Sequence, residues 1–530
     1  MTLLLLLGCH ADPVPDEGVA DTDERATAYD DTRVLEVALT LGDGDWEALR
    51  GETRSLWDIF GGDCLAEPFE SPFSWYAGDA TVDGVHLGTV RVRKKGFLGS
   101  LESARPSLKL DLGRGVHGVT RLTLNNGRED PTGLRTCLAY KTYAAAGVPA
   151  PRCTLAHVIV NGEDLGVYAN VEPIDENFLT RRGFSPDGAL FEGTLSDFRE
   201  GWTGTFDPET ESADVADLHR VVEAVDSSDL DLLSDAVDLD AYLDFWAAEV
   251  LVGQWDGYSA NTNNFFVYDD PSTGLIRLLP WGPDAAFDSD AASVRANAAL
   301  AQAVLVAPGG EEAYLAHVTA LLDDVWDGDA MAEEVDRLAD LADPWQGDEF
   351  RADVGSLRAF VEGRADAIRA ELVADPTVST GALRETPCFV ERGSIATTFS
   401  TTWDTLGRDP WTTGSTTMAV TWDGVPLTMT SGGAIAGAQG DTAVAAAYAS
   451  RSDGSYLVSY AYLSVDALAP GRFPFDFVDV VGVLLYSNGT SGPGLAAYVA
   501  EGEVTFDAAG SSPGDVVSGR IDGKLVAYGW

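Results

Sequence analysis

A group of acidic and amide side chains between residues 254 and 288 has the types and the spacing that phosphoryl transfer requires. Asp256 is followed five residues later by Asn261 and, three residues further on, by Asn264. Asp284 comes after a stretch that is typical of a β-hairpin. Phosphoryl transfer needs a carboxylate that orients the attacking hydroxyl and oxygen ligands that hold Mg²⁺ on the phosphates. We therefore assign the first role to Asp256 and a metal-binding role to the other three residues.

The spacing leaves a second interpretation open. In protein kinases a catalytic Asp precedes a metal-binding Asn at the same spacing, and another metal-binding Asp follows a short hairpin. Asp and Asn are also common in loops, where they form turns and cap helices. On spacing alone, Asp256, Asn261 and Asp284 are therefore either catalytic residues or turn and cap residues.

Other catalytic motifs are missing or incomplete. The sequence has no G-x-x-x-x-G-K-[ST] phosphate loop and no G-x-G-x-x-G motif, and its six histidines show no zinc-binding pattern. Residues 510–514 match G-x-S-x-G, but Pro513 follows Ser512 where a nucleophile elbow continues into a helix. We therefore predict neither a serine hydrolase nor a zinc enzyme.

Hydrophobic patterns predict the elements that position the candidate residues. Alternating apolar residues between turn residues predict strands and hairpins, and a period of about 3.6 residues predicts helices. The predicted strands and hairpins cover residues 34–41, 80–93, 108–112, 155–172 and 265–279, and the predicted helices cover residues 133–146, 214–251 and 311–373. Because strands come early and helices late in one unit, residues 33–376 are predicted to form an α+β domain.

Residues 385–530 have a different character. Thr, Ser, Gly, Val and Tyr occur there in short runs separated by turn residues. This pattern predicts a small all-β domain, either a sandwich or an open barrel. A chain of 530 residues is too long for one hydrophobic core, which agrees with two or more domains.

The charge of the chain limits its partners. It contains 85 Asp and Glu residues against 34 Lys and Arg, a formal net charge of −51. Such a field repels nucleic acid and anionic membrane surfaces. We therefore predict no nucleic-acid partner. The acidity is either a general property of the surface or a patch for one basic partner.

The first nine residues resemble the end of a bacterial lipoprotein signal. An apolar run stops at Leu7-Gly8-Cys9, and acidic residues follow as far as residue 31. The run is too short to span a bilayer, but cleavage before Cys9 would leave this cysteine first and ready for lipidation. We expect residues 1–32 to be a signal and an acidic tether, with the protein exported and held at the cell envelope through its lipid anchor only. A buried N-terminal strand is the alternative.

The other four cysteines form no C-x-x-C motif; they are Cys64, Cys137, Cys153 and Cys388. Outside the cytoplasm, two disulfides are compatible with this number. The sequence leaves both the pairing and the alternative of free thiols open.

Several short motifs occur in the order found in the CotH family, the spore-coat protein H type of atypical kinase. The resemblance covers about residues 34–373, and its motifs lie at residues 92–96, 107–110, 122–126, 130–135, 160–172, 256–264, 280–284 and 360–364. The resemblance implies an atypical protein-kinase-like fold that uses ATP and Mg²⁺ to phosphorylate Ser or Thr on a protein partner.

The resemblance also implies roles for residues far from Asp256. Lys109 is expected on a strand against the nucleotide phosphates, where a compact positive charge is suited; an exposed strand face is the alternative. Glu172 either lines the nucleotide pocket or caps a strand. Asp130 and Arg135 match a D-x-x-x-x-R element, which we interpret first as an ion pair or helix cap and second as a nucleotide contact.

One departure from the family bears on function. The family usually has Pro-Trp-Asp-x-Asp where this chain has Gly282 in place of the first Asp. If Asp284 is the metal ligand, the site is complete; if position 282 supplied it, the domain is a pseudokinase. Two functions therefore stand: a Mg²⁺- and ATP-dependent Ser/Thr kinase at the cell envelope, and a non-catalytic surface, adhesion or coat-assembly protein with a degenerate kinase-like fold.

Overall fold

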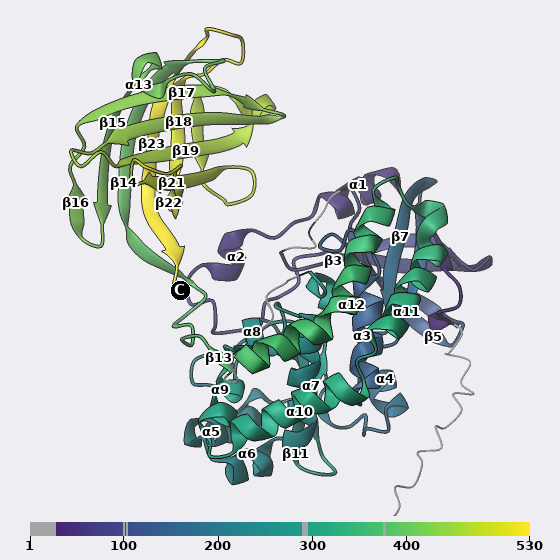
Figure 1. Cartoon of the computed structure of the whole chain (residues 1–530). Coiled ribbons are helices and arrows are strands. Elements are labelled where there is room, and N and C mark those ends of the chain that lie inside the picture. The colour runs from purple at the N-terminus through teal and green to yellow at the C-terminus, as the bar shows by residue number, and fades with distance from the viewer. Residues whose placement is uncertain (1–27, 99–100, 102–103, 289–294, 375–377, 530) are drawn as a thin grey trace, which may run out of the picture.

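The computed structural model describes residues 28–98, 101, 104–288, 295–374 and 378–529, so Cys9 lies outside the described residues. A mixed helical and stranded body is followed by a body made almost entirely of strands (Figure 1). The predicted α+β character of the N-terminal body is confirmed. No helix in the described ranges is long and apolar enough to cross a membrane.

Seven strands at the start of the chain form a closed barrel in the order β1-β2-β3-β4-β5-β7-β6. Apolar side chains alternate with polar ones, for example along β1, and the apolar set fills the barrel because successive side chains of a strand point to opposite faces. Most polar side chains in the middle of β3 and β4 therefore lie outside the barrel, whereas Lys94 near the end of β3 is buried. The strands are β1 (Leu35–Leu41), β2 (Tyr76–Val82), β3 (Val85–Lys95), β4 (Ser107–Val116), β5 (Val119–Asn125), β6 (Cys153–Val160) and β7 (Glu163–Val171).

A second sheet, in the order β11-β10-β8-β9, lies among the helices of the N-terminal body. Its strands are β8 (Ala189–Gly193), β9 (Phe206–Pro208), β10 (Phe265–Asp270) and β11 (Leu275–Pro280). The hairpin of β10 and β11 pairs Phe265 with Pro280, so the residues just before and just after it lie together. This pairing matches the hairpin predicted for residues 265–279.

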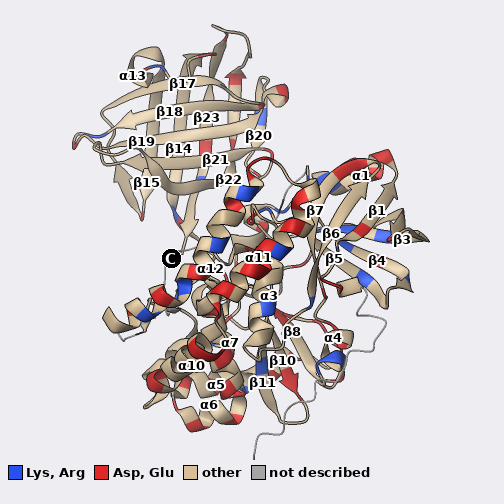
Figure 2. Cartoon of the chain, turned by 45° about the vertical axis from the view of Figure 1, so that its right-hand side comes forward, with Lys and Arg blue, Asp and Glu red and all other residues tan. Residues whose placement is uncertain are grey.

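Most helices of this body bury their apolar faces in one large core that also includes residues of the second sheet, whereas the helix of residues 176–181 packs in a smaller cluster with Phe266 and Tyr268. The helices are α3 (Arg135–Ala145), α4 (Glu176–Arg181), α5 (His219–Ser227), α6 (Leu230–Ala236), α7 (Leu239–Val252), α8 (Tyr258–Asn261), α9 (Ala299–Val306), α10 (Gly310–Asp324), α11 (Gly328–Ala342) and α12 (Phe350–Ala374). Figure 2 shows acidic side chains spread over the outer helices, whereas the C-terminal body carries few charges on the face shown.

The C-terminal body is one antiparallel sheet that curls around its own core. Strands from both ends of the sheet contribute to that core, for example Val420 from β15 and Ala434 from β17. This arrangement corresponds to the open-barrel alternative. The strands are β14 (Phe389–Thr402), β15 (Ser415–Trp422), β16 (Val425–Leu427), β17 (Ser431–Gln439), β18 (Thr442–Ser450), β19 (Tyr456–Ser464), β20 (Gly471–Pro474), β21 (Val481–Ser487), β22 (Gly494–Ala508) and β23 (Val516–Tyr528), with a short helix, α13 (Pro410–Thr413).

An aromatic cluster joins the two bodies across the predicted boundary. The short helix α2 (Leu56–Phe60), which follows α1 (Asp43–Gly51), packs on the C-terminal body. The ring centroids of Trp57 and Phe477 are 5.6 Å apart, and those of Phe60 and Tyr528 are 5.0 Å apart. The disulfide Cys64–Cys388 reinforces this contact. The C-terminal body therefore shares a small core with a segment that the sequence assigns to the other domain.

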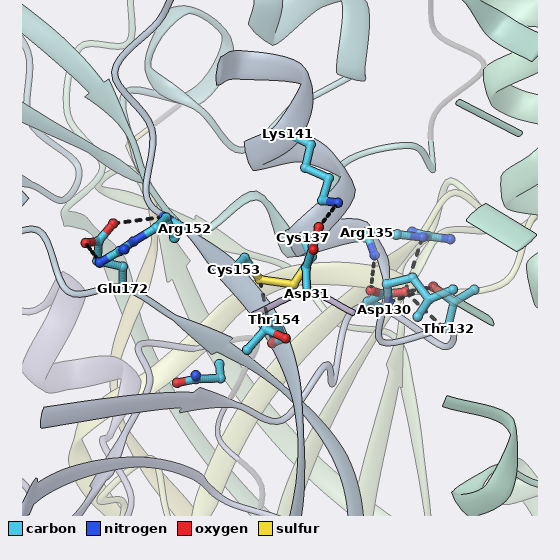
Figure 3. Close-up of a disulfide and its surroundings, with 12 residues drawn as sticks. Asp31, Asp130, Thr132, Arg135, Cys137, Lys141, Arg152, Cys153, Thr154 and Glu172 are labelled. Atoms are coloured by element: carbon cyan, nitrogen blue, oxygen red, sulfur yellow. Dashed lines mark hydrogen bonds and ion pairs between the residues drawn. A yellow bond between two sulfur atoms is a disulfide. The ribbon is translucent and has the colours of Figure 1, made fainter. Parts of the chain in front are cut away.

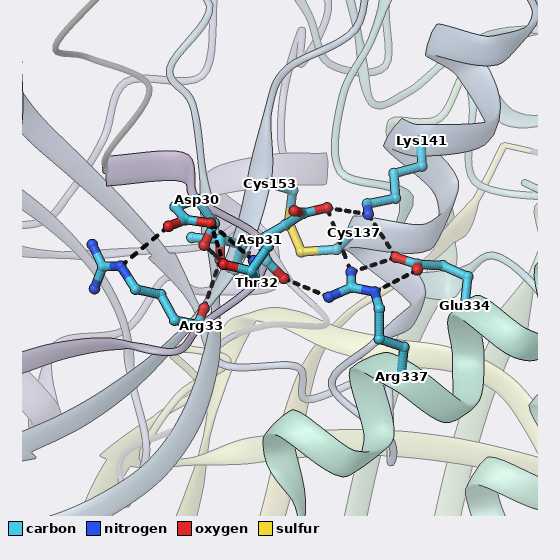
Figure 4. Close-up of polar contacts among 10 residues, drawn as sticks. Asp30, Asp31, Thr32, Arg33, Cys137, Lys141, Cys153, Glu334 and Arg337 are labelled. Atoms are coloured by element: carbon cyan, nitrogen blue, oxygen red, sulfur yellow. Dashed lines mark hydrogen bonds and ion pairs between the residues drawn. A yellow bond between two sulfur atoms is a disulfide. The ribbon is translucent and has the colours of Figure 1, made fainter.

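The first described residues are part of the N-terminal body rather than of a tether. Tyr29 is buried, and Asp31 contacts both Lys141 of α3 and Arg337 of α11 (Figure 4). Glu334 completes this group with an ion pair to Lys141 of 2.6 Å. The folded body therefore begins by residue 28, whereas the sequence analysis placed its start at residue 33.

Candidate active site

The end of α7 fixes where the candidate catalytic loop begins. Gly253 has φ +66°, a left-handed conformation that lets the chain leave the helix abruptly. The buried Arg364 of α12 donates to the carbonyl oxygens of Val250 and Leu251, at 2.6 and 3.2 Å. Both carbonyls belong to the last turn of α7, where few intrahelical donors remain, so α12 holds the chain where it enters the loop.

The buried Glu249 then sets the direction of the loop. Its carboxylate accepts hydrogen bonds from the backbone N–H groups of Tyr258 and Ser259, at 2.8 and 3.1 Å, and thus caps the first turn of α8. Burial raises the pKa of Glu249 to about 7, against the lowering effect of these hydrogen bonds. The single turn of α8 brings Asn261 back toward Asp256.

Asp256 is surrounded by three asparagine amides. The Nδ2 groups of Asn261, Asn263 and Asn264 donate to its carboxylate oxygens at 2.5, 3.2 and 2.7 Å. Burial raises the pKa of Asp256, and the amide hydrogen bonds oppose that rise. The structure therefore brings together Asp256, Asn261 and Asn264, and it adds Asn263, which the sequence analysis did not select.

We expect Gly257→Ala to disturb this loop, because no space exists for a methyl group at Gly257. A Cβ atom there would lie 2.1 Å from Oε1 of Glu249 and 2.9 Å from Cγ of Gln254. Displacing the buried carboxylate should cost about 1–3 kcal/mol of unfolding free energy, measurable by denaturant titration. Gly347→Ala is the matched control, since a Cβ at Gly347 meets nothing within 4 Å. Equal stabilities for the two variants would contradict the capping role of Glu249.

Asp284 lies beside this loop, in a short turn (Pro283–Ala285) directly after β11. Burial raises its pKa to about 6; the charge of Lys95 lowers it, and those of Asp256 and Asp130 raise it further. The two candidate carboxylates, Asp256 and Asp284, are thus close enough to repel each other. The hairpin brings the two carboxylates together, because its two ends are joined by a hydrogen bond from the backbone N–H of Trp281 to the carbonyl of Asn264, at 3.3 Å.

Lys95, at the end of β3, is a site residue that the sequence analysis missed. Its ammonium group donates to Asn125 at 2.5 Å and lies 5.6 Å from the ring centroid of Trp281. Burial and the charge of Lys109 lower its pKa to about 8, and the charges of Asp284 and Glu192 oppose this. The alternation of β3 could have identified it: Lys94 points into the barrel and donates to the backbone oxygens of residues 50 and 52, so its neighbour points outward.

Lys109 occupies the outer face of β4, next to Lys95. Burial raises the pKa values of Asp207 and Glu209, and the charge of Lys109 lowers both. Basic side chains on the outside of the barrel therefore face acidic side chains on and beside β8 and β9. The predicted strand position of Lys109 agrees with the structure, but Lys95 is the lysine whose charge lowers the pKa of Asp284.

Gly282 has φ +51°, and a Cβ atom there would lie 2.7 Å from Oδ1 of Asn264. Position 282 therefore faces the Asp256 loop. A side chain at this position would be strained by the backbone conformation and would displace Asn264.

Glu172 and Asp130 are engaged in structural contacts (Figure 3). Glu172 is buried at the end of β7 and binds Arg152 and Arg181, at 2.9 Å to each. Asp130 accepts from the backbone N–H of Arg135 at 2.7 Å, at the start of α3. Figure 3 also shows the disulfide Cys137–Cys153, which joins α3 to β6. These contacts match the strand-cap alternative for Glu172 and the helix-cap interpretation of Asp130.

The donor set around Asp256 fits a hard cation such as Mg²⁺. The residues around it can offer oxygen ligands, namely the carboxylates of Asp256 and Asp284 and the amide oxygens of Asn261 and Asn264, whose NH₂ groups are turned toward Asp256. Across the ranges that the structure describes, no group of three or more His, Cys, Asp or Glu side chains is suited to a metal. Mg²⁺ in phosphate-binding sites commonly uses only one or two carboxylates, together with water and phosphate oxygens.

The residues of this site lie within the part of the chain that resembles known proteins. A family model described as CotH kinase protein matches residues 92–368. Inner spore coat protein H of Bacillus subtilis (strain 168) is 28% identical over 193 residues, which are 33% of this chain and 51% of that protein. The chain thus spans about half the length of this curated relative. The crystal structure of the proinflammatory kinase CtkA of Helicobacter pylori aligns with a TM-score of 0.28 and 12% identity, over 53% of this chain and 94% of that chain.

Proposed function

Because the chain belongs to the CotH kinase protein family, we propose that its N-terminal body transfers a phosphoryl group from Mg²⁺-ATP to a Ser or Thr hydroxyl of a protein. The observation that carries this proposal is the convergence of Asp256, Asp284 and Lys95. They come from three separate segments of the chain. Lys95 lowers the pKa of Asp284, and Asp256 raises it. An arrangement of one base, one metal ligand and one phosphate-binding cation is what phosphoryl transfer needs.

Each residue has a role that its surroundings support. Asp256 accepts three amide hydrogen bonds and would accept a fourth from the substrate hydroxyl, which orients that hydroxyl for attack. Lys95 and Lys109, on the outer face of the barrel, would bind phosphate oxygens. Asp284, Asn261 and Asn264 would hold Mg²⁺, whose positive charge offsets the charge that develops on the phosphates.

Calorimetric titration of the whole chain with ATP, in the presence and absence of Mg²⁺, tests the proposal. We expect ATP binding that depends on Mg²⁺. ATP at about 100 times its dissociation constant should also raise the free energy of unfolding of the protein by roughly 2.7 kcal/mol. Transfer of labelled phosphate to the protein itself or to casein would then show catalysis. Absence of ATP binding would contradict the proposal.

Gly282 favours the second candidate function, a surface or coat-assembly protein that has lost catalysis. Position 282 faces Asn264, yet it carries no side chain where the family usually has Asp. Binding of Mg²⁺-ATP without phosphate transfer, to itself or to casein, would support this alternative over the kinase.

We expect ATP affinity to fall above pH 8, because Lys95 has a pKa of about 8 and loses its charge there. Affinity should be about tenfold lower at pH 9.5 than at pH 7.5. Asp284, with a pKa of about 6, is already ionised throughout this range. Calorimetry at several pH values measures the effect. Lys95→Arg, which stays charged, should remove most of it; an equal loss in that variant would assign the dependence to another group.

We also propose export and lipidation at Cys9, in agreement with the spore-coat location in the name of the relative. Cys9→Ser should release the protein from the membrane fraction into the soluble fraction, because a thioether-linked lipid needs the cysteine sulfur. Fractionation followed by immunoblotting measures this. Unchanged membrane association and unchanged gel mobility would contradict the anchor.

A further inference from the structure

Arg384 places a positive charge in the candidate active site from outside the region that the family model matches. It follows β13 (Ser379–Thr380) in the segment that leads from α12 to the C-terminal body. Its Nη2 group donates to Oδ1 of Asn261. Its charge also lowers the pKa of Asp256, which burial raises. The side chain is partly buried, so it is built into the site rather than lying on the surface.

The contact determines how the Asn261 amide is oriented. A carboxylate only accepts hydrogen bonds, and a guanidinium only donates them. The Nδ2 group of Asn261 must therefore face Asp256, and its Oδ1 must face Arg384. As a result, the oxygen that we assign to the metal is already bound to a cation of the protein itself.

The segment that carries Arg384 is attached to the body on both sides. Before it, the backbone N–H of Gly381 donates to Asn297 at 3.2 Å, and Gln302 donates to the carbonyl of Gly381 at 2.8 Å. After it, Cys388 forms the disulfide with Cys64. Figure 1 shows this segment leading from β13 to the C-terminal body. Arg384 is thus held at Asn261 by contacts that involve both bodies.

We propose that Arg384 is a built-in competitor for the metal ion, so that the segment between the two bodies regulates the candidate active site. This inference rests on the proposed function. While Arg384 is bound, the Oδ1 atom of Asn261 already accepts from a guanidinium, and a second cation at the same oxygen is repelled by its charge. Binding of Mg²⁺-ATP and retention of Arg384 at Asn261 therefore oppose each other, and by linkage each weakens the other to the same extent.

The geometry favours competition over a role in phosphate binding. Arg384 contacts a candidate metal ligand, and its charge acts on the candidate base, whereas Lys95 and Lys109 are carried by the barrel strands β3 and β4. A phosphate-binding arginine would be expected among those lysines. Removing the guanidinium should raise the affinity for Mg²⁺-ATP if Arg384 competes with the metal, and lower it if Arg384 binds phosphate.

Calorimetry of Mg²⁺-ATP binding to the whole chain distinguishes competition with the metal from phosphate binding by Arg384. Arg384→Gln is expected to bind about 5- to 20-fold more tightly than the wild type. Arg384→Lys, which keeps the charge but loses the planar fork, should fall between them. Arg408→Gln is the matched control, because it removes the same charge from an exposed position of the C-terminal body. Circular dichroism and thermal melting verify that each variant is folded.

Hydrogen exchange provides a measurement that does not depend on catalysis. Saturating Mg²⁺-ATP should increase amide exchange in residues 381–388 of the wild type, because Arg384 leaves Asn261. Equal affinities for the wild type and Arg384→Gln, with unchanged exchange, would overturn the competition and leave the proposed function intact. Weaker binding by Arg384→Gln would overturn it in favour of a phosphate ligand. Failure of every variant to bind would overturn the proposed function, and the competition with it.

Discussion

Asp256→Asn is expected to lower phosphate transfer about a thousandfold or more and to leave Mg²⁺-ATP binding within a few-fold of the wild type. Orientation of the acceptor hydroxyl matters mainly in the transition state, so its loss affects the rate more than nucleotide binding. Initial rates of phosphate transfer to casein or to the protein itself, combined with calorimetry, measure the two effects separately.

The surroundings of Asp256 add a second consequence of this change. Three amide N–H groups donate to the carboxylate, and an asparagine there would place its own NH₂ group against at least one of them. A loss of about 1–3 kcal/mol in unfolding free energy is therefore expected. Asp269→Asn is the control, since Asp269 lies on β10 and pairs with Arg220. A rate for Asp256→Asn close to that of this control would exclude Asp256 as the catalytic carboxylate.

Asp284→Asn is expected to weaken Mg²⁺-dependent ATP binding about a hundredfold while leaving binding without Mg²⁺ nearly unchanged. The variant removes one of the two carboxylates near the proposed cation, and an amide is a weaker ligand for a hard divalent ion. Titration with ATP at several Mg²⁺ concentrations measures both constants. Asp288→Asn is the control, because Asp288 is an exposed carboxylate four residues further along that pairs with Arg135.

The same substitution should stabilise the protein in the absence of metal. Burial raises the pKa of Asp284 from 3.8 to about 6, so the folded state disfavours the ionised form. The wild type therefore loses stability as the pH rises from about 4 to about 6, and the asparagine variant lacks this loss. Above pH 6 the variant should be more stable by roughly 1–2 kcal/mol, a value reduced for partial exposure. Lower stability than the wild type at pH 7 would indicate a structural role for Asp284.

Part of the candidate site depends on short stretches of chain, and the sequence was sufficient there. Asp256 and Asn261 are joined by one turn of helix, which returns the chain to its starting point. Asn264 and Asp284 flank a hairpin, and antiparallel pairing brings the two ends of a hairpin together. The alternating pattern at residues 108–112 predicted the strand that carries Lys109, for the same local reason.

Other parts depend on contacts between distant segments, and the sequence left them open or missed them. The partners of Glu172 are arginines that follow β7 or precede β6, which no periodic pattern could indicate. The aromatic side chains of α2 showed no sign that they would pack on the C-terminal body. The pairing of Cys64 with Cys388 spans 324 residues, so only the packing of both bodies could select it among the possible pairings.

The sequence by itself determined the α+β character, the strand-rich C-terminal region, the local geometry of the Asp256 loop and the resemblance to the CotH family. Chain connectivity and side-chain periodicity act over a few residues, and both can be recognised in a single sequence. The tertiary structure alone decided that the charge of Lys95 acts on Asp284, and that Arg384 reaches Asn261 across 123 positions of the chain. Such contacts form because burial of many apolar side chains compensates the entropy of closing long loops, and this balance belongs to the whole fold rather than to any segment.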